Sequence, residues 1–253
     1  MPFEKLKQGE NNSFFITKRK SFEALYDLSG SAETVFEFAY GMTFGKKGGH
    51  RDYRTGGELK RKNGELFINT FQGKLAEFGI WKFFSEKNTA LPEPDVNMWA
   101  KGKWDDTDLI VSGKKINVKS AAHFSNLLLL ETKDWDADGH YIPNKEKGTD
   151  AYDYFILSRL KPDGKALMKN AKLFSADEAD KDVLKKLILT QQWKFDIAGF
   201  ISSEELKNLI AEKFVLPQHA LLEGRIKMDA ENYYCQSGGM HNINELLRQL
   251  GGG

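Results

Sequence analysis

The sequence predicts a mixed α/β or α+β protein in which helices flank a central β-sheet. The chain has 253 residues, of which 40% are hydrophobic and 12% aromatic, so it can bury a substantial core. Segments with a helical period recur along the chain, and short apolar segments typical of strands lie between them. Helices that flank a sheet indicate a layered architecture. We expect residues 1–253 to form a single domain.

The charge and cysteine content restrict the functional class. Thirty-seven basic and 36 acidic side chains give a formal charge of +1, which excludes a histone-like polycation. Cys235 is the single cysteine, so no internal disulfide can form, and we expect a buried thiol in a reducing compartment. The start, MPFEKLKQGENNSFF, lacks the apolar centre of a signal peptide, and no apolar run could span a bilayer. We therefore expect a cytoplasmic, soluble protein without membrane contact.

The N-terminal half predicts one strand and two helices. A short strand is expected at residues 13–17, and Ser31 is placed as the N-cap of a helix that ends near Met42. From residue 69 to about 85, apolar side chains three or four positions apart form one helical stripe. They are Phe71, Leu75, Phe78 and Trp81.

The remaining elements are expected further along the chain. Residues 125–131, SNLLLLE, fit either a buried helix or a strand. Strands are predicted at residues 154–160 and 193–197. Helices are predicted at residues 180–191 and 203–213, the second with an N-terminal cap in SSEEL, and in the tail HNINELLRQL.

Residues 43–62, TFGKKGGHRDYRTGGELKRK, form a glycine-rich basic segment with a net charge of +5. Its glycine spacing differs from that of a phosphate-binding P-loop, which requires G-x-x-x-x-G-K-[ST]. Such a segment is often only a solvated surface loop. The alternative is a DNA-contacting loop whose basic side chains bind phosphates. The candidates are Lys46, Lys47, Arg51, Arg54, Lys60 and Arg61.

A β-hairpin is predicted in WDDTDLIVSGKKINVKS, residues 104–120. If Ser112 and Gly113 form the turn, Asp108 lies opposite Asn117; if the turn is one residue later, Asp108 lies opposite Lys119. Because side chains alternate along a strand, both registers place these three polar residues on one face and leave an apolar face on the other side.

The polar face fits a phosphodiester-cleaving site. Carboxylates such as that of Asp108 can hold Mg²⁺, which neutralises phosphate charge and lowers the pKa of a bound water. The ammonium of Lys119 can orient that water. Glu77, beside the stripe of the 69–85 helix, could supply a second carboxylate. The alternative is an exposed ion pair within the hairpin, worth under about 1 kcal/mol.

These residues resemble the PD-(D/E)xK nuclease superfamily, whose core is a helix, a mixed sheet and a second helix. Asp108 matches the first acid and Lys119 the lysine, whereas Asn117 stands at the second acid position and Val118 between them. Glu77, in GKLAEFGI, resembles the metal-supporting glutamate of the first core helix. The likeness implies a restriction-endonuclease-like core at about residues 69–160 and a C-terminal strand and helix extension at about 190–253.

The resemblance implies a Mg²⁺-dependent endodeoxyribonuclease similar to type II restriction enzymes. Asp108, Glu77 and the Val118 carbonyl would be metal ligands, with Asn117 positioning the metal shell and Lys119 orienting the water. The partner would be double-stranded DNA, bound by a homodimer if the target is palindromic. Because Asn117 replaces an acid, a non-catalytic DNA-binding relative remains an alternative, as does a structure-specific repair nuclease.

Overall fold

The computed structural model describes residues 3–45, 61–87, 89, 91–96 and 109–251. Its central element is a five-stranded sheet in the order β3-β8-β7-β5-β4. Strands β5 and β7 are parallel and the other neighbouring pairs are antiparallel, so the sheet is mixed. The prediction of a mixed α/β protein with a central sheet is therefore confirmed. The strands are β3 (Tyr26–Asp27), β4 (Leu109–Val111), β5 (Lys114–Ala122), β7 (Tyr154–Lys161) and β8 (Lys194–Ser202).

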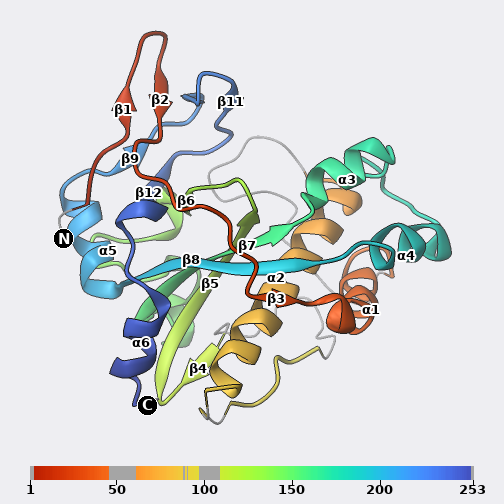
Figure 1. Cartoon of the computed structure of the whole chain (residues 1–253). Coiled ribbons are helices and arrows are strands. Elements are labelled where there is room, and N and C mark those ends of the chain that lie inside the picture. Colours follow the sequence, from red (N-terminus) through yellow and green to blue (C-terminus); the bar gives the residue numbers. More distant parts are fainter. Residues whose placement is uncertain (1–2, 46–60, 88, 90, 97–108, 252–253) are drawn as a thin grey trace.

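The first face of this sheet is covered by helices. Helix α2 (Asn63–Ser85) runs across it and contacts β5, β7 and β8 (Figure 1). At Gly79, a Cβ atom would lie only 2.6 Å from the Phe195 ring, so glycine permits the close approach of helix and sheet. Further helices complete this layer: α1 (Ala32–Met42), α3 (Gly164–Asn170), α4 (Lys181–Leu189) and α6 (Ile243–Gln249).

The second face is covered by a three-stranded sheet and helix α5. That sheet has the order β6-β12-β9, and a separate apolar core lies beneath it. The elements are β6 (Leu127–Glu131), β9 (Val215–Leu216), β12 (Asn232–Gln236) and α5 (Ser203–Ala211). Short 3-10 helices connect neighbouring elements: η1 (Ser29–Ser31), η2 (Thr132–Asp134), η3 (Ile142–Lys147) and η4 (Ser237–Gly239).

Two small hairpins form a four-stranded sheet that projects from the body of the molecule (Figure 1). Their central strands pair in parallel, with Leu222 opposite Phe14. The carboxylate of Glu223 accepts a hydrogen bond from the Ile16 backbone at 2.7 Å and so joins the two hairpins. The strands are β1 (Lys7–Gln8), β2 (Ser13–Phe15), β10 (Leu221–Leu222) and β11 (Ile226–Lys227).

Most of the predicted elements are confirmed, and two of them differ from the prediction by five residues or more. Helix α2 begins at Asn63, six residues before the predicted start, and β8 continues to Ser202. The segment left open between helix and strand is strand β6. Ser202 and Glu205 form a reciprocal capping box at α5, whereas Ser31 at α1 makes no side-chain cap. No helix among the described residues has the length and apolar character that crossing a bilayer requires.

Candidate functional site

The β4–β5 hairpin adopts the first of the two predicted registers. Leu109 pairs with Ile116 and Val111 with Lys114, which leaves Ser112 and Gly113 as a two-residue turn. Both turn residues have positive φ, 48° and 77°, as the type I′ turn of a twisted hairpin requires. Ser112 Oγ also donates a hydrogen bond of 3.0 Å to the Leu250 carbonyl. The hairpin is thus fixed in register at its tip.

This register places Asn117 and Lys119 on the second face of the sheet. Ile116 and Val118 contact the core beneath α2, so the residues that alternate with them point the other way. Asn117 pairs with Phe155 of the neighbouring strand β7, and Lys119 pairs with Leu157 of β7. Phe155 and Leu157 both belong to the second core. The predicted sharing of one face by Asn117 and Lys119 is confirmed. Asp108, the third member, lies outside the described residues.

Asn117 is buried but incompletely hydrogen-bonded. The residue is only 5% exposed, and its Oδ1 has no hydrogen-bond partner among the residues that the structure describes. Leaving a buried polar atom unpaired costs about 1–3 kcal/mol, so such an atom requires an explanation, for instance an ion or a water. Asn117 therefore offers a free oxygen acceptor on the second face.

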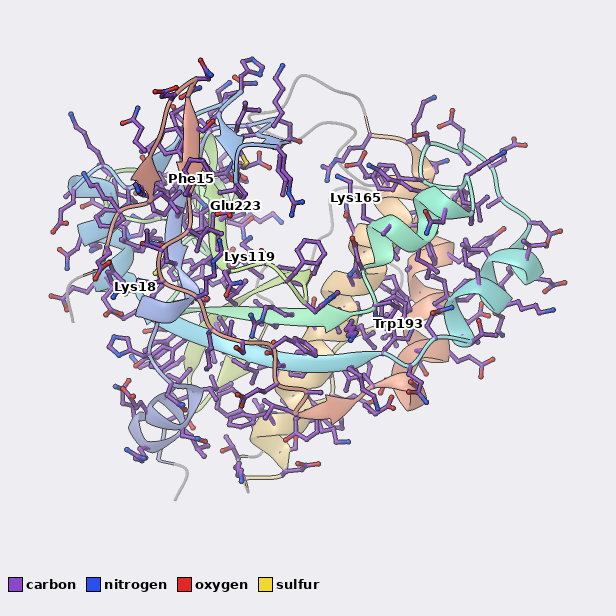
Figure 2. All side chains as sticks on the ribbon, turned by 45° about the horizontal axis from the view of Figure 1, so that its top comes forward. Phe15, Lys18, Lys119, Lys165, Trp193 and Glu223 are labelled. Atoms are coloured by element: carbon purple, nitrogen blue, oxygen red, sulfur yellow. The ribbon has the colours of Figure 1, made fainter. Side chains whose placement is uncertain are left out.

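Lys119 is half-buried, two residues beyond Asn117. In the part of the chain that the structure describes, its ammonium has no ion pair or side-chain hydrogen bond. Figure 2 shows Lys119 between the projecting hairpins, where Phe15 and Glu223 are labelled, and helix α3, where Lys165 is labelled. With respect to the described residues, this cation is available for an anionic ligand.

Glu77 lies elsewhere. It is on α2, which packs on the opposite face of β5 from Asn117 and Lys119. Its Oε2 accepts a hydrogen bond of 2.6 Å from Lys74 Nζ, and both side chains are nearly buried. The same Lys74 ammonium lies 5.3 Å from the centre of the Phe38 ring on α1. The described contacts thus join Glu77 to the helical layer and do not bring it to Lys119.

The other predicted ligand and DNA contacts are only partly described. The side chain of Val118 faces the first core, so only its backbone oxygen could serve as a ligand. Arg61 lies two residues before the start of α2, and the neighbouring Lys62 pairs with Asp177 at 2.5 Å. The rest of the predicted basic loop lies outside the described residues, namely Lys46, Lys47, Arg51, Arg54 and Lys60.

The described residues alone do not form a complete metal site. No group of three or more His, Cys, Asp or Glu side chains that could hold a metal occurs among them. They offer the amide oxygen of Asn117, which has no hydrogen-bond partner among them. Mg²⁺ prefers at least one carboxylate, so the fit to this ion depends on Asp108.

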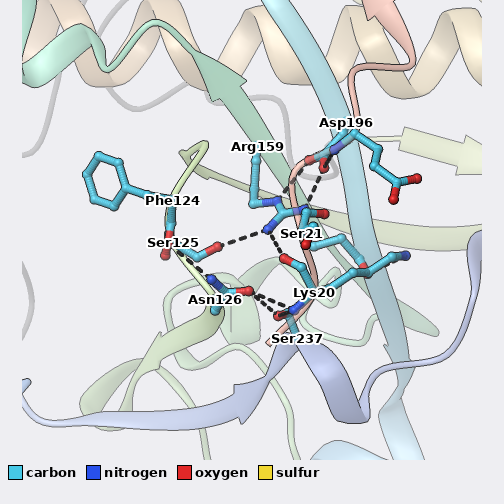
Figure 3. Close-up of polar contacts among 10 residues, drawn as sticks. Lys20, Ser21, Phe124, Ser125, Asn126, Arg159, Asp196 and Ser237 are labelled. Atoms are coloured by element: carbon cyan, nitrogen blue, oxygen red, sulfur yellow. Dashed lines mark hydrogen bonds and ion pairs between the residues drawn. The ribbon is translucent and has the colours of Figure 1, made fainter. Parts of the chain in front are cut away.

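A buried ion pair that the sequence reasoning missed lies on the same second face. Arg159 of β7 is fully buried and donates from Nε and Nη2 to the Asp196 carboxylate of β8, at 2.9 and 2.5 Å. Its Nη groups also donate to the carbonyls of Lys20, at 2.7 Å, and Ser21, at 2.8 Å (Figure 3). A possible signal was present, since each ion interrupts an otherwise apolar strand, in YFILSRL and KFDIAGF.

This pair is the centre of a larger polar network, which we call the Arg159 hub. Asn126 Oδ1 accepts hydrogen bonds from the Lys20 backbone at 3.0 Å and from Ser237 Oγ at 2.6 Å. Lys20 Nζ donates to the Ala198 carbonyl at 2.9 Å, and burial lowers the pKa of this lysine. The hub consists of Lys20, Ser21, Ser125, Asn126, Arg159, Asp196 and Ser237 (Figure 3).

Comparisons with known proteins give no match: none was found among protein-family models, curated proteins or solved structures.

Proposed function

We propose that this protein is a Mg²⁺-dependent DNA endonuclease with a restriction-endonuclease-like core, hydrolysing phosphodiester bonds at a specific duplex sequence. The observation that carries the proposal is that two polar groups on one strand both lack a hydrogen-bond or ionic partner among the described residues. Among the described residues, neither the buried Asn117 Oδ1 nor the Lys119 ammonium two residues later has a partner. Both face the same side of a hairpin that Asp108 immediately precedes.

Each residue has a defined role in this proposal. Asp108 would be the principal ligand of Mg²⁺, and the bound ion would neutralise phosphate charge and activate a water. Asn117 Oδ1 would be a neutral oxygen ligand of the metal, at the position where the family has its second acid. Lys119 orients the attacking water and balances negative charge as it develops. Glu77 remains a candidate for a water-mediated contact only, because its carboxylate is held by Lys74 on α2.

The partner in this proposal is double-stranded DNA. The basic segment at residues 43–62 would bind its phosphates, since cations supply much of the affinity for duplex DNA. A palindromic target would require a homodimer, one active site for each strand. The single buried cysteine fits the reducing cytoplasm, where we expect the protein to act.

The test is incubation of the purified protein with a large unmodified phage DNA in Mg²⁺. We expect discrete fragments, which EDTA abolishes. Lys119→Ala should slow cleavage by roughly 10²–10⁴-fold. Lys114→Ala is the matched control: Lys114 lies on the same strand, is exposed and pairs with Asp153 at 3.0 Å, so its loss should leave cleavage unchanged.

Other outcomes lead to other functions. Salt-sensitive DNA binding without cleavage in any metal would indicate a non-catalytic DNA-binding protein, a reading that Asn117 in place of an acid favours. Cleavage restricted to branched or damaged DNA would indicate a structure-specific nuclease. If Lys119→Ala cuts as fast as wild type, the hairpin is structural and the site assignment is wrong.

A further inference from the structure

Phe124 combines exposure with a rigid backbone. It follows β5 on the turn that leads to β6, five residues after Lys119, and it is 57% exposed. A single exposed apolar side chain is common and by itself indicates nothing. What distinguishes Phe124 is the structure beneath it, because its turn is held by hydrogen bonds on both sides.

Several backbone groups of this turn are hydrogen-bonded. His123 N donates to the Leu160 carbonyl at 2.9 Å, and Ser125 N to the Ala122 carbonyl at 2.8 Å. Asn126 Nδ2 donates to the carbonyl of Phe124 itself at 3.1 Å. On the other side of the turn, the Ser125 carbonyl accepts from Arg159 at 3.4 Å. The turn therefore has little freedom to fold Phe124 back onto the protein.

Holding the turn through the Arg159 hub costs free energy, because the hub contains a buried ion pair. A buried ion pair loses much hydration energy, and apolar side chains of similar volume often stabilise a protein as well or better. The hub does fix the position of several chain segments relative to the sheet, including the turn at residues 123–126 and the segment at residues 20–21 (Figure 3). Figure 3 shows the Phe124 ring pointing away from this network. The hydration energy that the buried pair loses has a reason if the position of Phe124 is important for function.

The surroundings of Phe124 are aromatic and basic. Its ring meets the ring of His123 edge to face, with centres 5.2 Å apart, and His123 in turn meets Phe22 at 5.9 Å. Lys161 is exposed and ends β7 beside this turn. Burial of His123 lowers the pKa of its ring, and the positive charge of Lys161 lowers it further. Exposed aromatic rings beside cations are the combination that binds stacked bases and phosphates.

We propose that Phe124 is a preorganised wedge that inserts into a base step of duplex DNA beside the cleavage site. Apolar side chains that enter a base step unstack it and bend the duplex, and a rigid mounting reduces the cost of ordering the wedge on binding. Lys161 would bind a flanking phosphate. This inference rests on the proposed function, because it requires DNA as the partner.

The experiment measures binding of two fluorescein-labelled duplexes of the same mixed sequence, one fully paired and one with a single mismatch. EDTA is present, so that no cleavage occurs. Wild type should prefer the mismatched duplex, in which unstacking is less costly. Phe124→Ala should weaken binding by roughly 5- to 100-fold and abolish that preference, whereas Phe124→Trp should retain both.

Val183→Ala is the matched control, because Val183 is a similarly exposed apolar residue, at 61%, on helix α4. It should bind as wild type does. If wild type binds DNA and Phe124→Ala binds both duplexes equally tightly, the wedge is wrong while the nuclease proposal survives. If wild type binds neither duplex, the proposed function fails and the wedge with it. Far-ultraviolet circular dichroism should show every variant folded, since both residues are exposed.

Discussion

Two polar regions on the second face of the central sheet differ in how well their groups are paired. Asn117 and Lys119 lie on β5, opposite Phe155 and Leu157 of β7. One step further along the same face, Ala121 lies opposite Arg159, the centre of the hub. In the hub, the guanidinium and the carboxylate are matched by donors and acceptors from four chain segments. At Asn117, a buried oxygen has no hydrogen-bond partner within the described part of the chain.

The difference indicates what each region is for. A fully paired buried network fixes the positions of the segments that it joins, and no donor or acceptor remains for a ligand. An unpaired buried acceptor lowers stability and therefore requires an explanation, of which a bound ion or water is one. We therefore interpret the hub as architectural, and the proposed function assigns its chemistry to the Asn117–Lys119 region.

The largest expected effect is on the hub. Asp196→Ala would leave Arg159 buried without a counter-ion, so it should lower the free energy of unfolding by about 3–5 kcal/mol. Urea unfolding followed by circular dichroism measures this change. The control is Asp27→Ala, which breaks the exposed pair of Asp27 with Lys194, at 2.7 Å, and should cost much less.

A double replacement sharpens the result. Arg159→Met together with Asp196→Leu removes both charges, and should recover most of the stability lost in Asp196→Ala. If Asp196→Ala costs no more than Asp27→Ala, the hub does not hold the sheet and the contrast with Asn117 disappears.

A smaller effect, of opposite sign, is expected at Asn117. Asn117→Leu removes an unpaired buried acceptor, so the free energy of unfolding should rise by about 1–3 kcal/mol. Cleavage of phage DNA should fall in the same variant. Asn126→Leu provides the matched control, because Asn126 is also a buried asparagine on this side of the molecule, but its Oδ1 accepts two hydrogen bonds. Equal destabilisation by both variants would show that Asn117 has a structural partner.

The hairpin could be predicted from the sequence because its information is local. Alternating apolar residues define its two faces, and Ser112 and Gly113 suit the two-residue turn. The stripe of α2 was likewise visible from its period. The stripe did not reveal which face of the sheet the helix covers, and Glu77 consequently proved to lie on the far side from Lys119.

The hub could not be predicted, because its members are distant in sequence. Arg159 and Asp196 are 37 residues apart, and Lys20 is 139 residues from Arg159. Their pairing depends on the order of strands in the sheet, which no local pattern encodes. The projecting hairpins were mostly missed for a different reason: their strands of two or three residues are too short to display a period.

The smallest effect on the free energy of unfolding is expected from His123, which precedes Phe124 in the turn at residues 123–126 and packs against its ring. Burial, and after it the charge of Lys161, lowers the pKa of His123, so the unfolded chain binds this proton more readily than the folded one. The resulting contribution to stability is present above about pH 6.5, the ordinary histidine value, and is lost as the pH falls through the lower folded value. Urea unfolding at about pH 7.5 and about pH 5 should therefore show that acid lowers the free energy of unfolding less in His123→Phe than in wild type.

His219→Asn, a change at an exposed position with positive φ that asparagine tolerates, should keep the wild-type loss. An undiminished acid loss in His123→Phe would mean that His123 is as well solvated as an unfolded histidine, and that the turn beneath Phe124 is looser than its hydrogen bonds indicate.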